Sequence, residues 1–284
     1  MELNFKQELT AVFGHPVAEN PTQAMVEAAY RYHNLAWRYL TVEVLPEDLG
    51  AAVAGARAMG WQGFNLTIPH KVAVMPFLDS IGESAQKIGA VNCVVARDGG
   101  LVGENTDGRG FLESLREVVD PAGLDVMILG SGGAARAVAV ELALAGAGAL
   151  TIVNRTESSG RALVEDLRKV GATASFRPWD ETISVPESTQ VLVNATSIGL
   201  FPDVKGCPPV DFAALAPHTV VADVIPNPPS TPFLRHAAAR GCRTIDGLGM
   251  LINQGRLGIR YWTGVDPDAA VMRSALETIF SQEG

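Results

Sequence analysis

Short apolar runs alternate with amphipathic stretches along most of the chain, and this alternation predicts an α/β fold. Runs that are long enough for a buried strand lie at residues 9–13, 37–45, 64–68, 126–129, 150–153, 172–176, 190–194, 220–224 and 243–246. Segments with helical periodicity lie at residues 21–32, 108–119, 160–170 and 232–240, and at residues 250–280 in two pieces around 263–267. Residues 91–96 and 101–103 form a predicted hairpin across Asp98-Gly99-Gly100, a turn that needs positive φ.

The most informative stretch is residues 126–156, which predicts a strand, a glycine-rich turn, a helix and a second strand. In the turn, glycines allow backbone N–H groups to approach a pyrophosphate, which the helix N-terminus then stabilises. The sequence therefore predicts a dinucleotide site, and the residues expected to form it are Gly130, Ser131, Gly132, Gly133 and Ala134. The alternative is a tight turn that only packs the helix against the sheet.

The end of the second strand indicates which dinucleotide binds. A cofactor with a free ribose 2′-hydroxyl usually meets Asp or Glu at this position. Here the strand ends in Asn154, Arg155 and Thr156, and the first carboxylate, Glu157, comes after it. Because a guanidinium pairs well with a 2′-phosphate, these residues favour NADP over NAD. The alternative for Arg155 is a solvated residue at a helix start.

Composition narrows the class of protein. The 284 residues predict one large domain or two medium ones, and 47% hydrophobic against 19% charged residues is typical of a soluble globular chain. The net charge of −9 argues against nucleic acid, but a local cation can still bind a small anionic substrate. The three cysteines form neither a disulfide framework nor a metal-ligand spacing, so we expect a cytoplasmic protein without a metal. No signal peptide and no membrane-spanning run is expected.

Polar residues at strand ends and in loops are the candidates for chemistry, because α/β folds place their sites there. Lys71 in NLTIPHK could exchange protons if partly shielded from water, and the alternative is an ordinary surface lysine. Asn92 lies in an otherwise apolar strand, so backbone or ligand must satisfy its amide. Asp107 in ENTDG could hold a lysine ammonium or a substrate hydroxyl, or only cap a helix. The alternative for Gln254 is a solvated helix residue.

Together these motifs resemble the shikimate dehydrogenase family from near Gly14 to the C-terminus. NLTIPHK, GAVNC, ENTDG, GSGGAARA, NRT, NATSIG, STPFL and GLGMLINQG match family motifs in the same order. The resemblance implies two α/β domains with a cleft between them. Residues 1–106 and 250–284 would form the substrate-binding domain, and residues 107–249 a Rossmann-type NADP-binding domain.

The resemblance also implies an activity in aromatic amino acid biosynthesis, the reversible reduction of 3-dehydroshikimate to shikimate or a close analogue. Lys71 and Asp107 match the family's catalytic pair. Residues that would bind the ring hydroxyls are Asn65, Thr67, Asn92 and Gln254. Thr196 and Gly247 would extend the cofactor site. We expect a small cyclic hydroxy-acid substrate and a monomer or homodimer.

Two departures from the family pattern bear on the substrate. The family's first loop carries two serines that bind the substrate carboxylate, whereas residues 14–22 here read GHPVAENPT and contain no serine. Asn20 and Thr22 are the candidates to replace one of them, and Glu19 would repel a carboxylate if it pointed inward. Pro226 stands where the family has tyrosine. The hypothesis is that the reaction type is kept and the substrate has changed, for example to quinate, in a quinate- or aminoshikimate-type dehydrogenase.

A third alternative is a non-catalytic homologue that senses a metabolite. Retention of both Lys71 and Asp107 argues against it, because sensing needs no proton donor.

Overall fold

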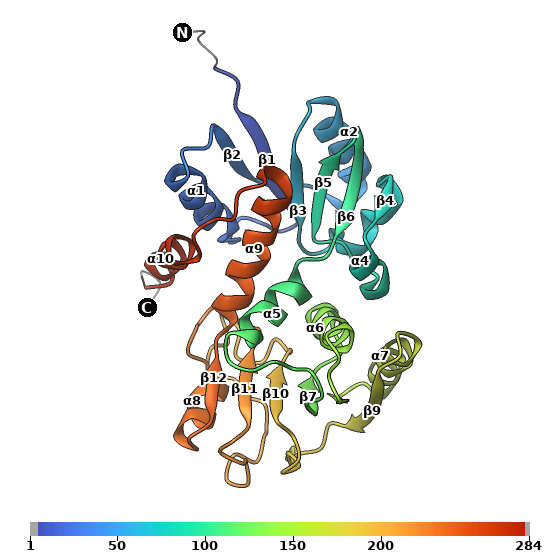
Figure 1. Cartoon of the computed structure of the whole chain (residues 1–284), viewed down its shortest axis with the longest axis vertical. Helices are drawn as coiled ribbons and strands as arrows, with labels where there is room; N and C mark the ends of the chain where they lie inside the picture. Colours follow the sequence, from blue (N-terminus) through green and yellow to red (C-terminus); the bar gives the residue numbers. More distant parts are fainter. Residues whose placement is uncertain (1–4, 282–284) are drawn as a thin grey trace. The chain divides into compact units, whose positions relative to one another are not determined.

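A computed structural model describes residues 5–281 of the chain, which divide into two compact units. Unit 1 runs up to Thr106 and resumes at Gln254, and unit 2 runs from Asp107 to Asn253. Within the described residues, each unit is built on one six-stranded sheet flanked by helices (Figure 1). The α/β class predicted from the hydrophobic pattern is therefore confirmed.

The sheet of unit 1 has the strand order β2-β1-β3-β5-β6-β4. Its strands are β1 (Glu8–Gly14), β2 (Trp37–Glu43), β3 (Gly63–Leu66), β4 (Ser80–Ile81), β5 (Cys93–Arg97) and β6 (Gly100–Glu104). Strands β1, β2 and β3 are parallel, and β5 pairs antiparallel with β3 and with β6. The predicted hairpin is confirmed, because Asp98 and Gly99 join β5 to β6 with φ values of 52° and 80°.

The helices of unit 1 are α1 (Thr22–Tyr32), α2 (Leu49–Ala58), α3 (His70–Ala73), α4 (Glu83–Ile88) and α10 (Ala269–Phe280), with the later part of α9 (Gly247–Thr263). Phe13 of β1 stacks on Phe64 of β3 in the core, with ring centroids 4.6 Å apart. Trp262 of α9 donates its indole N–H to Val94 O at 2.9 Å. A Cβ on Gly63 would lie 2.2 Å from that indole, so only glycine allows this packing.

Unit 2 has an entirely parallel sheet of order β12-β11-β10-β7-β8-β9. Its strands are β7 (Val126–Leu129), β8 (Ala149–Asn154), β9 (Thr173–Pro178), β10 (Val191–Asn194), β11 (Val220–Asp223) and β12 (Arg243–Ile245). Its helices are α5 (Asp107–Arg116), α6 (Gly133–Leu144), α7 (Glu157–Lys169) and α8 (Pro232–Ala239). The strand order reverses direction at β7, which is the position where Rossmann-type sheets bind their ligands.

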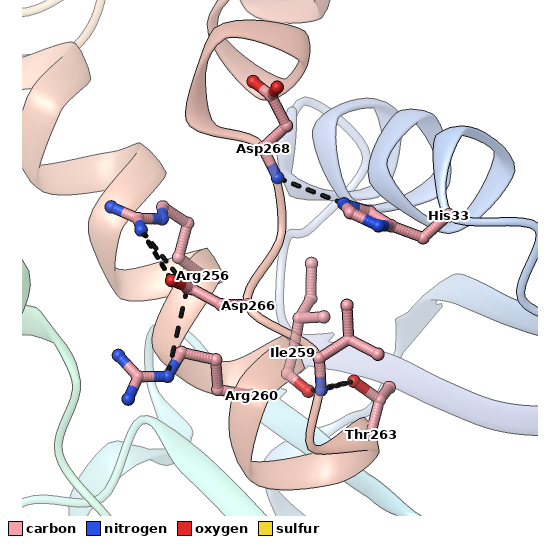
Figure 2. Close-up of polar contacts among 8 residues, drawn as sticks. His33, Arg256, Ile259, Arg260, Thr263, Asp266 and Asp268 are labelled. Atoms are coloured by element: carbon pink, nitrogen blue, oxygen red, sulfur yellow. Dashed lines mark hydrogen bonds and ion pairs between the residues drawn. The ribbon is translucent and has the colours of Figure 1, made fainter.

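A polar turn joins α9 to α10 within unit 1, as Figure 2 shows. Asp266 lies 3.2 Å from Arg256 and 3.9 Å from Arg260, measured between carboxylate oxygen and guanidinium nitrogen. The backbone N–H of Asp268 donates to Nε2 of His33, the residue that follows α1, at 3.2 Å. The carboxylate of Asp268 accepts from Ala270 N and Val271 N and so caps α10. The two helical pieces predicted for residues 250–280 are confirmed.

Some boundaries differ from the prediction. The hydrophobic pattern did not predict α3, β4 and α4, since each has only two to six residues, too few to establish a period. Helix α7 begins at Glu157 rather than at residue 160, directly after the extended Thr156. Asn92 lies immediately before β5 rather than inside the strand. Within residues 5–281, no helix is long and apolar enough to cross a bilayer.

Candidate active site

In unit 1, a buried network of amides and hydroxyls joins several predicted substrate-binding residues. Asn65 on β3 donates from Nδ2 to Asn92 O at 3.0 Å. The Asn92 side chain bonds Thr106, which donates its backbone N–H to Asn92 Oδ1 at 2.7 Å. The Thr106 hydroxyl lies 3.4 Å from Gln254 Oε1. The exposed fractions of Asn65, Asn92 and Gln254 are 6% or less, so the solvated alternative for Gln254 is wrong.

The loop of residues 14–22 follows β1 and lies beside Thr67, the residue after β3. A Cβ on Gly14 would lie 2.3 Å from Thr67 Cγ2, so glycine allows the close approach. Asn20 accepts the backbone N–H of Thr22 through Oδ1 at 3.0 Å. Thr22 itself is 5% exposed. This hydrogen bond uses the amide oxygen of Asn20 and leaves its amide nitrogen as the donor group of the side chain.

The predicted catalytic residues lie in the segments that follow β3 and β6. Lys71 is half-buried in the short helix α3, and its carbonyl accepts Val91 N–H at 2.7 Å. Asp107 is half-buried, begins α5 and follows Thr106 directly in the chain. The neighbouring His70 is fully buried, and its Nε2 lies 2.8 Å from Val44 O, which links α3 to the segment after β2.

In unit 2, the predicted pyrophosphate turn lies between β7 and α6. Gly130 has a φ of 108°, and a Cβ there would lie 2.9 Å from Ala195 O, so this position requires glycine. Gly132 and Gly133 have open space where a side chain would lie. Gly132 precedes α6, whose first turn includes Ala134, and the Ser131 hydroxyl donates to Ser159 at 3.0 Å. Open backbone at a helix N-terminus fits a dinucleotide pyrophosphate.

A cationic side chain, Arg155, follows the end of β8. Arg155 is exposed, and its guanidinium lies 6.0 Å from the ring centroid of Trp179. Asn154 donates from Nδ2 to Thr156 O at 2.9 Å and to Ser159 Oγ at 3.0 Å. These contacts order the segment that carries Arg155. Sequence reasoning missed Trp179, which follows β9 and lies 24 residues from Arg155 in the chain.

Two further cofactor candidates shape loops at the same edge of the sheet. The Thr196 hydroxyl donates to Asn194 Oδ1 at 2.7 Å and accepts Ile198 N–H at 3.1 Å, which organises the loop after β10. A Cβ on Gly247 would lie 2.2 Å from Ile225 O, so glycine lets α9 begin against the segment after β11. Thr196 and Gly247 therefore help to shape the loops at the end of the sheet where the strands finish.

Asp223 is a buried carboxyl that the sequence did not single out. It lies at the end of β11 and accepts from the Thr231 hydroxyl at 2.8 Å, from Asn194 Nδ2 at 3.2 Å and from Ile225 N–H at 3.1 Å. Burial raises its pKa to about 6, although these hydrogen bonds oppose the shift. The contacts connect the end of β11 to the start of α8.

Titratable groups do not gather into a metal site in the part of the chain that the structure describes. No three His, Cys, Asp or Glu side chains within residues 5–281 are grouped closely enough to hold a metal ion. The three cysteines, Cys93, Cys207 and Cys242, are all free thiols.

Comparison with known proteins identifies the family. Residues 12–94 match the shikimate dehydrogenase substrate binding domain, and residues 247–277 match the shikimate 5′-dehydrogenase C-terminal domain. A relative named shikimate dehydrogenase (NADP(+)) from Moorella thermoacetica is 44% identical over 94% of this chain and 92% of its own.

Solved structures extend the comparison. A shikimate dehydrogenase crystallised with NADP+ has a TM-score of 0.91 and 38% identity over 98% of both chains. The ligand-free 5-ketofructose reductase of Gluconobacter sp. strain CHM43 has a TM-score of 0.95 and 54% identity, covering 98% of this chain and all of that one. These full-length matches confirm the resemblance carried by the motifs: the chain belongs to the shikimate dehydrogenase family.

Proposed function

We propose that this protein is an NADP-dependent oxidoreductase that interconverts a ketone and a secondary alcohol on a small polyhydroxylated substrate. The observation that carries the proposal is the full-length similarity to NADP-dependent shikimate dehydrogenases, at 41% identity over 96% of both chains in the relative from Desulforamulus reducens. The open glycine turn between β7 and α6 supports cofactor binding in unit 2. The amide and hydroxyl network supports substrate binding in unit 1.

For the cofactor, we assign the pyrophosphate to the turn at residues 130–134 and the 2′-phosphate to Arg155, with Asn154 and Thr156 beside it. Thr196 and Gly247 build loops at the same edge of the sheet. A guanidinium suits a phosphate dianion, which supports NADP over NAD.

For the reaction, a nicotinamide cofactor held by unit 2 would supply the hydride chemistry, in which NADPH reduces a carbonyl carbon and NADP+ oxidises the alcohol in the reverse direction. The Lys71 ammonium stabilises the negative charge that develops on the carbonyl oxygen and donates a proton to it. Asp107 matches the family's catalytic aspartate, the second member of the catalytic pair that the motifs imply. Asn65, Thr67, Asn92 and Gln254 would donate to or accept from the substrate hydroxyls.

The substrate has two candidates, and particular observations favour each. Curated relatives at 38–44% identity are shikimate dehydrogenases, which makes shikimate the first candidate. The 54% identity to a 5-ketofructose reductase favours 5-ketofructose, a sugar derivative with two ketones and no carboxylate. The loop of residues 14–22 supports the second candidate, because it contains neither of the two serines that bind the substrate carboxylate in the family. We therefore infer that 5-ketofructose is preferred.

The deciding experiment is steady-state kinetics with purified protein on both substrate pairs, 5-ketofructose with NADPH and shikimate with NADP+. We expect kcat/KM for 5-ketofructose to exceed that for shikimate by about 10-fold or more, the equivalent of one lost polar contact. A higher kcat/KM for shikimate would show that the substrate has not changed. Quinate serves as a third substrate, for the quinate-type alternative.

The Lys71→Ala variant tests the mechanism. We expect kcat to fall by about 10²- to 10⁴-fold, the usual contribution of a positioned proton donor, while NADP+ binding is kept. Lys87→Ala is the matched control, because Lys87 is half-buried like Lys71 and pairs with the exposed Glu83 at 2.7 Å in the same unit. Undiminished turnover in Lys71→Ala would exclude Lys71 as the proton donor. Tight binding of a substrate by the wild type without any hydride transfer would support the non-catalytic metabolite sensor instead.

The free thiols of the three cysteines support the predicted cytoplasmic location. A monomer or a homodimer stays a prediction.

A further inference from the structure

A buried tyrosine hydroxyl is bonded to one of the candidate substrate-binding residues. Tyr39 of β2 donates to Asn65 Oδ1 of β3 at 2.7 Å, and both side chains are buried. The strand register explains the contact, because Tyr39 pairs with Thr10 of β1, and Asn65 pairs with Val12 of β1. Thr10 and Val12 are two residues apart, so all four side chains lie on the same face of the sheet and Tyr39 reaches Asn65 across β1.

This hydroxyl fixes which way the Asn65 amide points. The oxygen of Asn65 accepts from Tyr39, and its nitrogen donates one N–H to Asn92 O at 3.0 Å. A flipped amide would place its oxygen against the carbonyl oxygen of Asn92, where two acceptors repel each other. Burial raises the pKa of Tyr39 well above its usual range, so the phenol stays protonated and keeps donating.

In this fixed orientation, the Asn65 oxygen accepts from Tyr39 and one N–H group of its amide remains to be used. An amide nitrogen carries two donors, and Asn92 O takes one of them. The second N–H therefore has a defined direction and can donate to a carbonyl or hydroxyl oxygen of a ligand. Asn92 O also accepts the backbone N–H of Leu66 at 2.9 Å, and this second hydrogen bond fixes the position of the carbonyl to which Asn65 donates.

We propose that Tyr39 is a positioning residue for substrate binding, which acts by presenting the second N–H of Asn65 to a substrate oxygen. This inference rests on the proposed function, in which Asn65 binds the substrate. It adds a residue that none of the family motifs quoted above contains, from a strand that no sequence motif linked to the substrate site.

Tyr30 provides a matched control in the same unit. Its hydroxyl forms a buried hydrogen bond with Thr10 Oγ1 at 2.9 Å, and the side chain is 1% exposed. Tyr30→Phe and Tyr39→Phe each remove one buried hydroxyl from the same unit, so their costs to stability should be similar. Only Tyr39 contacts a candidate substrate-binding side chain.

The test is a double-mutant cycle with Tyr39→Phe, Asn65→Ala and the double variant, measured on 5-ketofructose with NADPH and on shikimate with NADP+. Loss of one orienting hydrogen bond should raise KM for the substrate by about 3- to 10-fold in Tyr39→Phe and leave KM for the cofactor unchanged. In the Asn65→Ala background, Tyr39→Phe should have no further effect. Tyr30→Phe should leave both KM values unchanged.

Several outcomes would overturn the inference. These are an unchanged substrate KM in Tyr39→Phe, an undiminished effect of Tyr39→Phe in the Asn65→Ala background, or an equal rise in KM in Tyr30→Phe. Wild-type kinetics in Asn65→Ala would also overturn it and would remove Asn65 from the substrate site. Absence of turnover of both substrates by the wild type would instead refute the proposed function on which the inference rests.

Discussion

At the scale of single residues, Arg155 carries the predicted choice between NADP and NAD. Its guanidinium is exposed at the end of β8 and has a ring contact with Trp179. We expect Arg155→Gln to lower the ratio of kcat/KM for NADP over NAD by about 10- to 100-fold, because a charge-assisted bond to the 2′-phosphate is lost. Arg161→Gln is the control, since Arg161 pairs with Glu157 at 2.7 Å. An unchanged ratio in Arg155→Gln would contradict the assignment.

The ring of Trp179 should support that arginine. We expect Trp179→Leu to raise KM for NADP by about 2- to 5-fold and to leave KM for NAD unchanged, since exposed cation–π contacts are weak. Phe176→Leu removes the corresponding ring beneath Arg161, 5.2 Å from its guanidinium, and should change neither value. Equal effects of the two variants on NADP and NAD would indicate a general disturbance of β9 instead.

Asp223 should make stability depend on pH. Its folded-state pKa of about 6 lies above the ordinary 3.8, so the folded state holds this proton more tightly than the unfolded state. The tighter binding of this proton adds about 3 kcal/mol to the free energy of unfolding. This added stability is fully present below about pH 4 and is lost as the pH rises through about 6. In urea unfolding, the free energy of unfolding of the wild type should therefore fall relative to that of Asp223→Asn as the pH is raised from about 4 to above 6. The exposed Asp180→Asn variant should show no such shift.

Residues with a local signature were predictable, and residues that depend on strand register were not. Asn65, Asn92 and Gln254 were predicted from motifs, and the structure shows them buried, with Asn65 bonded to Asn92 and Gln254 beside Thr106. Tyr39 gave no signal, because its contact with Asn65 depends on how β2 and β3 align on either side of β1. Asp223 gave none either, since the pKa of a carboxyl depends on its burial in the fold.

At the scale of elements, segments with a clear apolar run or helical period were predicted, whereas α3, β4 and α4 were not. The strand–turn–helix of β7 and α6 follows directly from four buried apolar residues, then glycines, then a twelve-residue helix. By contrast α3, which carries Lys71, has four residues and is set by its neighbours. Its position depends on contacts such as His70 with Val44 O, which link residues far apart in the chain.

The start of α10 gives a prediction at this scale. Asp268 accepts two backbone N–H groups of the first turn, and its own N–H donates to His33 after α1 (Figure 2). We expect Asp268→Ala to lower the free energy of unfolding by about 1 kcal/mol, because the cap is lost. Asp268→Ser keeps a capping oxygen and should lose much less. Equal losses in the two variants, measured by urea unfolding, would show that the cap does not stabilise α10.

At the scale of the whole molecule, the chain builds two units with separate cores and separate polar sites. Unit 1 buries Phe13 and Phe64 under its mixed sheet, and unit 2 buries Met127 and Leu192 in its parallel sheet. The amide network belongs to unit 1, and the glycine turn with Arg155 belongs to unit 2. This division implies that each ligand can be detected by its effect on one unit.

Hydrogen exchange can test directly whether the cofactor binds unit 2 and the substrate binds unit 1. NADP+ alone should slow amide exchange at residues 130–134 and 154–156, because backbone N–H groups of the turn become hydrogen-bonded and a ligand that binds only the folded state stabilises it. Residues 14–22 and 65–71 should respond to the substrate instead. In Arg155→Gln, the same NADP+ concentration should protect unit 2 less, while the response of unit 1 to substrate is kept. Protection by NADP+ that is strongest at residues 14–22 would contradict the assignment of the cofactor to unit 2.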